Sequence, residues 1–111
     1  MKAIFINAEK KSVEEIEIGD DWQLIAPQIG NGCRHFACAT ILENDDTIYV
    51  DDESLLHGEF KGYFKIGNSQ PFAGNGLIMG SDYEGKSVDV KSSVEEIRNA
   101  VTFPYVMIHA Y

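Results

Sequence analysis

The chain has 111 residues, 44% of them hydrophobic, which is enough apolar material for one globular core and excludes an intrinsically disordered protein. Its 18 acidic and 9 basic side chains give a net charge of −9 at pH 7, which disfavours direct binding to DNA or RNA, because cationic side chains supply most of that affinity. No apolar stretch is long enough for a membrane span or a signal-peptide core, so we expect a cytoplasmic protein with reduced cysteines.

The first 30 residues predict a hairpin followed by a short helix. Residues 2–7 and 12–18 alternate in hydrophobicity as strands do, with a polar turn between them. Because Val13 is out of step with Ile16, we expect a bulge or a later start of the second strand. A short or kinked helix is expected over residues 20–29, since two aspartates can cap its start and a proline interrupts it.

The middle of the chain predicts a second hairpin and a long loop. Residues 34–42 and 46–51 are apolar enough for strands, and the polar residues 44–46 between them are typical of a turn. Residues 60–66 predict another strand. Residues 67–76 contain several glycines and a proline, which is typical of a loop.

The C-terminal third predicts two short strands and the clearest helix. The strands are expected at 77–79 and 87–90. Ser92 is expected to cap the helix in a capping box with Glu95, and the last proline of the chain ends it. The apolar tail 105–111 alternates as an edge strand does. It would either pair across a homo-oligomer or close the sheet of its own monomer.

Together these elements predict a single α+β domain over residues 1–111. We expect a mostly antiparallel sheet of about five to seven short strands, with two short helices on one face.

Three potential metal ligands lie close together at Cys33, His35 and Cys38. Structural zinc sites need a second ligand pair, which would have to come from His57 or His109, and neither has a neighbouring ligand. We therefore predict no metal, no cofactor and no catalytic residues, and we expect Cys38 to be a small core residue in a strand. A Cys–His nucleophile pair has no glycine-flanked turn to support it.

The most distinctive feature is an acidic run over residues 43–59 without any lysine or arginine. Such a run creates a negative field that steers a basic surface towards it, and a row of carboxylates can imitate a phosphate backbone. The alternative is a solvated hairpin whose charges prevent edge-to-edge aggregation. The candidate partner-binding residues are the carboxylates of the run and one aromatic anchor beside it: Glu43, Asp45, Asp46, Asp51, Asp52, Glu53, Glu59 and Tyr63.

Two segments resemble a family of short, uncharacterised proteins encoded by phages, plasmids and integrated elements. The resemblance covers the two ends of the chain, under half of its length. It is carried by Met1–Ile4, Ile6-Asn7, Gly74–Gly80, Asp82, Glu84-Gly85, Val88–Val90, Ser93 and Glu95-Glu96. The family implies no activity and no catalytic residues. It does imply a small accessory protein in a bacterial host, a setting where small acidic proteins often block host defence enzymes.

The sequence therefore predicts a non-enzymatic, acidic binding protein of a phage or mobile element. We expect it to inhibit a host defence protein by occupying its basic nucleic-acid-binding surface, as a DNA mimic such as an anti-CRISPR does. One alternative is a module that binds or sequesters a nucleotide or another small molecule, with its pocket at loop 67–76 and the nearby aromatics. Another is a small Cys/His metalloprotein built on Cys33, His35 and Cys38.

Overall fold

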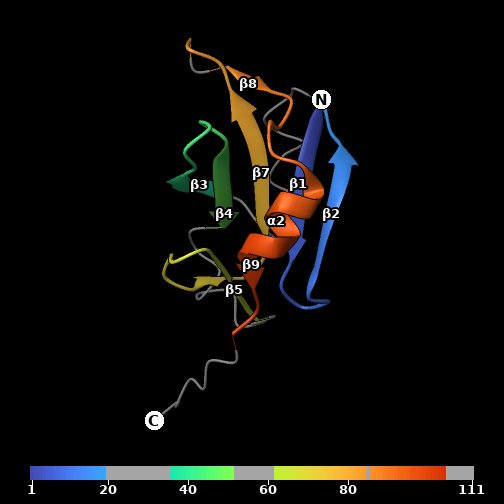
Figure 1. Cartoon of the computed structure of the whole chain (residues 1–111), viewed down its shortest axis with the longest axis vertical. Helices are drawn as coiled ribbons and strands as arrows, with labels where there is room; N and C mark the ends of the chain where they lie inside the picture. The colour runs from blue at the N-terminus through green and yellow to red at the C-terminus, as the bar shows by residue number, and fades with distance from the viewer. Residues whose placement is uncertain (20–35, 52–61, 85, 105–111) are drawn as a thin grey trace.

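The computed structural model describes residues 1–19, 36–51, 62–84 and 86–104, which form a mostly antiparallel sheet structure with one short helix (Figure 1). This confirms the predicted α+β class. The helix expected at 20–29 and the tail strand expected at 105–111 lie outside the described residues. Within the described parts, no helix is long and apolar enough to cross a membrane.

Six strands form the larger sheet, in the order β2-β1-β7-β4-β3 with β8 paired to the end of β7. Their bounds are β1 Lys2–Asn7, β2 Ser12–Glu17, β3 Phe36–Ile41, β4 Thr47–Asp51, β7 Gly76–Ser81 and β8 Ser87–Val88. Strand β7 lies in the middle of the sheet, and its residues 76–80 are all buried, as expected for a strand covered on both faces. It thereby joins the two hairpins of the first half of the chain.

The first hairpin has no bulge. The register of β1 and β2 runs without interruption, and Val13 pairs with Ile6 while Ile16 pairs with Ala3. These two pairs lie on opposite faces of the sheet and belong to different apolar clusters. The expectation of a bulge was wrong, because Val13 and Ile16 lie on opposite faces of a regular strand. Both faces of β2 carry apolar residues, so its sequence departs from simple alternation.

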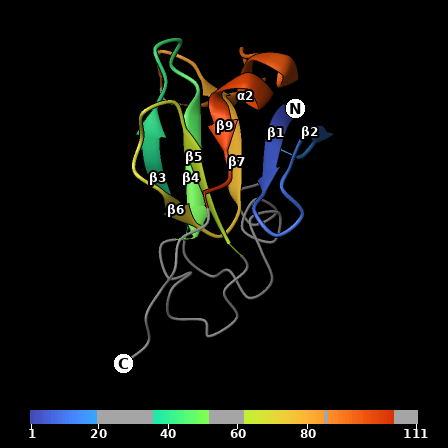
Figure 2. The same cartoon turned by 60° about the horizontal axis from the view of Figure 1, so that its bottom comes forward.

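A second, three-stranded sheet has the order β6-β5-β9, formed by β5 Tyr63–Ile66, β6 Phe72–Ala73 and β9 Val101–Thr102. Together with helix α2 (Val94–Ala100) it lies over one face of the larger sheet (Figure 2). In the segment expected to be a loop, residues 67–71 and 74–75 lie outside the strands, whereas Phe72 and Ala73 form β6 and Gly76 begins β7.

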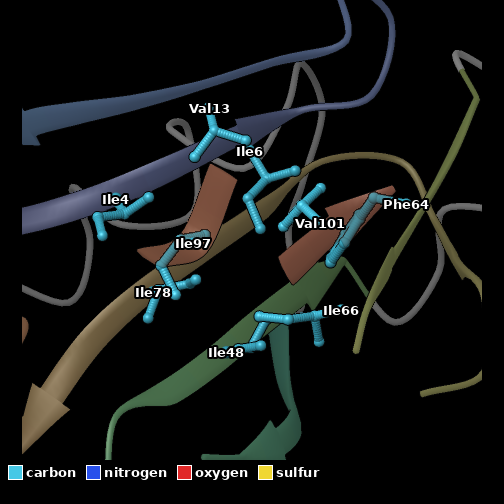
Figure 3. Packing of buried hydrophobic residues seen from close by; sticks show 9 residues of the cluster. All are labelled: Ile4, Ile6, Val13, Ile48, Phe64, Ile66, Ile78, Ile97 and Val101. Atoms are coloured by element: carbon cyan, nitrogen blue, oxygen red, sulfur yellow. The ribbon is translucent and has the colours of Figure 1, made fainter. Parts of the chain in front are cut away.

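The core lies between the larger sheet on one side and α2 with the smaller sheet on the other (Figure 3). Its buried members are Ile4, Ile6, Val13, Ile48, Phe64, Ile66, Ile78, Ile97 and Val101. Each such side chain contributes about 1.5–3 kcal/mol through burial. A Cβ atom on Gly76 would lie 2.6 Å from the Phe64 ring, so this position requires glycine.

Helix α2 begins one residue later than the sequence predicted. Ser93 is the N-cap, and it forms the capping box with Glu96 instead of the expected pair of Ser92 and Glu95. Ser92 has another role, because its backbone N–H and its hydroxyl both donate hydrogen bonds to Asp46. The two consecutive serines therefore have different roles: Ser93 caps α2, and Ser92 binds the Asp46 carboxylate.

Candidate interaction surface

Two polar turns lie at the same end of the larger sheet. The first joins β3 to β4 and the second joins β7 to β8, and the β7–β8 turn extends further towards the top of Figure 1. We call residues 41–46 and 81–84 together the turn end. Of the acidic run predicted from the sequence, residues 43–46 belong to the turn end, and residues 52–59 lie outside the described residues.

Local hydrogen bonds close the β3–β4 turn. The Leu42 N–H donates to the Asp46 carbonyl at 2.8 Å, and the Asp45 N–H donates to the Leu42 carbonyl at 3.0 Å. The Asn44 side-chain oxygen accepts the Asp46 N–H at 3.1 Å. Asp45 takes the left-handed conformation at φ 71°, which aspartate tolerates better than most residues. The turn therefore holds Asp45 at its tip, where the side chain is exposed.

Asp46 is completely buried, at 0% exposure, so its predicted place on an exposed acidic surface is wrong. Its carboxylate accepts the backbone N–H of Lys91 at 3.0 Å and that of Ser92 at 2.8 Å. It also accepts the Ser92 hydroxyl at 2.7 Å. These donors replace the water that the carboxylate loses on burial. Asp46 therefore fastens the β3–β4 turn to the segment before α2.

Lys91 connects the two turns. Its ammonium group donates to the Asn44 carbonyl at 3.1 Å and to the Ser81 carbonyl at 3.3 Å. The hydroxyls of Thr47 and Ser81 add a contact of 3.3 Å between β4 and β7. These hydrogen bonds thus hold together two turns that are far apart in the sequence.

The β7–β8 turn is built around Asp82. One oxygen of this carboxylate accepts the backbone N–H groups of Glu84 and Lys86, each at 2.9 Å. The side chains of Tyr83 and Glu84 are left exposed. This turn adds an aromatic ring and a free carboxylate to the turn end, and the sequence analysis did not select either.

Apolar side chains are exposed at the same end. Among the large hydrophobic residues that the structure describes, the exposed ones are Ile41 at 62% and Tyr83 at 97%. Ile41 pairs with Thr47 at the end of the edge strand β3, and β4 separates it from β7. Exposed apolar groups rimmed by charge are typical of protein–protein contacts.

The remaining predicted partner-binding residues do not join this surface in the described structure. Tyr63 is half-buried in β5, next to Gly62, which approaches the Ala8 backbone at the opposite end of the sheet. The side chain of Asp51 is outside the described part, as are Asp52, Glu53 and Glu59. Among the predicted carboxylates whose side chains the structure describes, those of Glu43 and Asp45 are exposed.

The Cys/His region is only partly described. Cys38 is a free, exposed thiol, so its predicted place in the core was wrong. It lies on β3, at the edge of the sheet, just before a shift in the strand register. Cys33 and His35 lie outside the described residues. In the ranges that the structure describes, no three His, Cys, Asp or Glu side chains gather as a metal site would require.

A shallow cleft of about 460 Å³ lies away from the loop proposed for a small molecule. Met1, Ser87, Val88 and Asp89 line it. Burial raises the pKa of the neighbouring Tyr49 phenol and Cys38 raises it further, while a hydrogen bond with Ser87 opposes the shift.

In the segment 67–76 proposed for a small-molecule pocket, Phe72 packs on Phe64 with ring centroids 5.5 Å apart. These two aromatics therefore serve the core.

Comparisons with protein-family models, with curated proteins and with solved structures found no significant match.

Proposed function

We propose that this protein is a non-enzymatic binding protein whose turn end docks on a basic surface of a partner protein. The observation that carries the proposal is that two turns far apart in the sequence lie at the same end of the sheet. Lys91 bonds both of them, and together they expose carboxylates and apolar side chains.

The charge of the chain supports a basic partner. With a net charge of −9, the protein attracts cationic surfaces over several ångströms and repels nucleic acid phosphates. Exposed carboxylates at the turn end are placed to set the orientation of the docked partner. Ile41 and Tyr83 supply apolar contacts, which add affinity to the orientation that the charges set.

The hydrogen-bonded base of the turn end favours tight association. Binding costs less when the contact residues are already ordered, since little conformational entropy remains to be lost. The bonds that Asp46 and Lys91 make provide this order before any partner arrives.

The proposal extends to the biological setting. The resemblance to phage and plasmid proteins favours a cytoplasmic inhibitor of a bacterial defence protein. A basic groove that normally holds nucleic acid would accept the turn end in place of phosphates, because carboxylates present the same sign of charge.

A pair of matched variants tests this function. In the turn variant, Glu43→Gln, Asp45→Asn and Glu84→Gln remove three exposed carboxylates from the turn end. In the control variant, Glu14→Gln, Glu15→Gln and Glu17→Gln remove three exposed carboxylates from β2. The net charge changes equally in both, so only the position of the charge differs.

The assay is affinity capture from a bacterial host lysate at low and moderate salt, read by mass spectrometry. The wild type and the control variant should recover the same basic protein, with recovery falling as salt rises. The turn variant should recover little of it. Equal recovery by all three proteins, or loss with the control variant alone, would contradict the proposal.

A further inference from the structure

Tyr83 is exposed to an extent that the fold does not explain. Its side chain is 97% exposed and makes no contribution to the apolar core. The Asp82 carboxylate fixes the turn on both sides of it, through the N–H groups of Glu84 and Lys86. The Asp82 N–H also donates to the Lys86 carbonyl at 3.0 Å. A closed turn therefore holds an aromatic ring in solvent.

The neighbours of this ring decide which group it would attract. Tyr83 stands between two carboxylates, Asp82 and Glu84, and the exposed carboxylates of Glu43 and Asp45 lie on the other turn. An aromatic face attracts cations through its negative quadrupole, and nearby carboxylates strengthen this attraction. The chemistry at this position thus fits a cationic side chain better than an apolar one.

We infer that Tyr83 is the anchor of the turn end and that it binds an arginine side chain of the basic partner, an inference that rests on the proposed function. Arginine is favoured over lysine for two reasons. Its planar guanidinium stacks on an aromatic face and gives up water more easily than an ammonium group. Its five N–H donors also allow two parallel hydrogen bonds to one carboxylate, such as that of Glu84.

Ile41 offers a second, separate apolar group at the turn end. It is 62% exposed and lies on the edge strand β3, which β4 separates from the β7–β8 hairpin that carries Tyr83. The turn end thus combines an aromatic ring, an aliphatic surface and carboxylates.

Two synthetic peptides test the inference with a defined ligand. They share one glycine- and serine-spaced sequence, with arginine at every basic position in the first and lysine in the second. Each is titrated into the full chain labelled with ¹⁵N, and amide shifts report both the site and the affinity. The variants are Tyr83→Leu, which removes the ring, and Tyr83→Phe, which keeps it. Neither is expected to disturb folding, because the side chain is exposed.

We expect shifts at residues 41–45 and 81–84 and tighter binding of the arginine peptide. Tyr83→Leu should weaken binding of the arginine peptide about 2–5-fold, so that the arginine peptide no longer binds more tightly than the lysine peptide. Tyr83→Phe should keep both the affinity for the arginine peptide and the preference for it over the lysine peptide. Equal binding of the two peptides at the turn end, unchanged by Tyr83→Leu, would overturn the inference and leave the proposed function standing. Shifts confined to residues 12–17 would overturn both.

Discussion

Strand β2 and the turn end are both acidic, but their carboxylates lie in different surroundings. On β2, Glu14, Glu15 and Glu17 line the outer strand of the larger sheet. Arg98 donates to the Val13 carbonyl at 3.0 Å, and Glu17 pairs with the N-terminal ammonium at 3.3 Å. Charges on an edge strand discourage another strand from adding to it, so those of β2 serve to protect the edge.

At the turn end the charges accompany exposed apolar groups. Glu43 and Asp45 lie on a turn fixed by a buried carboxylate, with Ile41 exposed on the same hairpin and Tyr83 exposed on the β7–β8 turn. The comparison teaches that the number of charges does not identify an interface. What distinguishes the turn end is charge together with apolar surface on an ordered support.

The largest expected effect concerns the support itself. Asp46→Ala leaves three buried or partly buried donors without an acceptor: the backbone N–H groups of Lys91 and Ser92 and the Ser92 hydroxyl. We expect a loss of about 3 kcal/mol in the free energy of unfolding, measured by urea denaturation.

The adjacent residue provides the control for this measurement. Asp45→Asn keeps a side chain that tolerates φ 71° and removes only an exposed charge, so the change should stay within about 0.5 kcal/mol. Equal stability of the two variants would show that the buried carboxylate does not hold the turn.

Lys91→Met is expected to have an intermediate effect. It removes the two hydrogen bonds that connect the Asn44 and Ser81 carbonyls and preserves most of the aliphatic side chain. The free energy of unfolding should fall by about 1 kcal/mol. Amide exchange should become faster at residues 43–46 and remain unchanged in β1. Unchanged exchange in the turn would mean that the two turns are held independently of Lys91.

The smallest effect should be a gain in affinity. Lys86 is exposed next to the Tyr83 turn and repels an incoming cation. Lys86→Gln should therefore tighten binding of the arginine peptide about twofold in an isothermal titration at low salt, and the gain should vanish at high salt. The same substitution at Lys10, an exposed residue of the β1–β2 turn, is the matched control and should produce a smaller gain. A gain of equal size at both positions would mean that only the net charge matters.

Part of this architecture was predictable from local sequence. The alternation in 2–7 and the turn residues at 44–46 correctly gave two hairpins, because strand period and turn chemistry are local properties. The start of α2 was misplaced by one residue because the partner of Ser92 is Asp46, which lies far away in the sequence. Local propensity carries no information about such a contact.

The candidate site was harder to predict for the same reason. Asp45 and Asp46 are adjacent and chemically identical, yet one is exposed at a turn and the other is completely buried. Nothing in the run of acidic residues separates these two roles. The turn at 82–84 was not selected as part of the site, because its position beside the β3–β4 turn results from the central position of β7.

The central claim is that the turn end, and not the acidic edge at β2, is the surface that binds. Amide hydrogen exchange of the full chain, with and without the captured basic partner, tests it most directly. The account predicts slower exchange on binding at residues 41–45 and 81–84, with no change at residues 12–17. Slower exchange along β2, with the turn end unaffected, would contradict it.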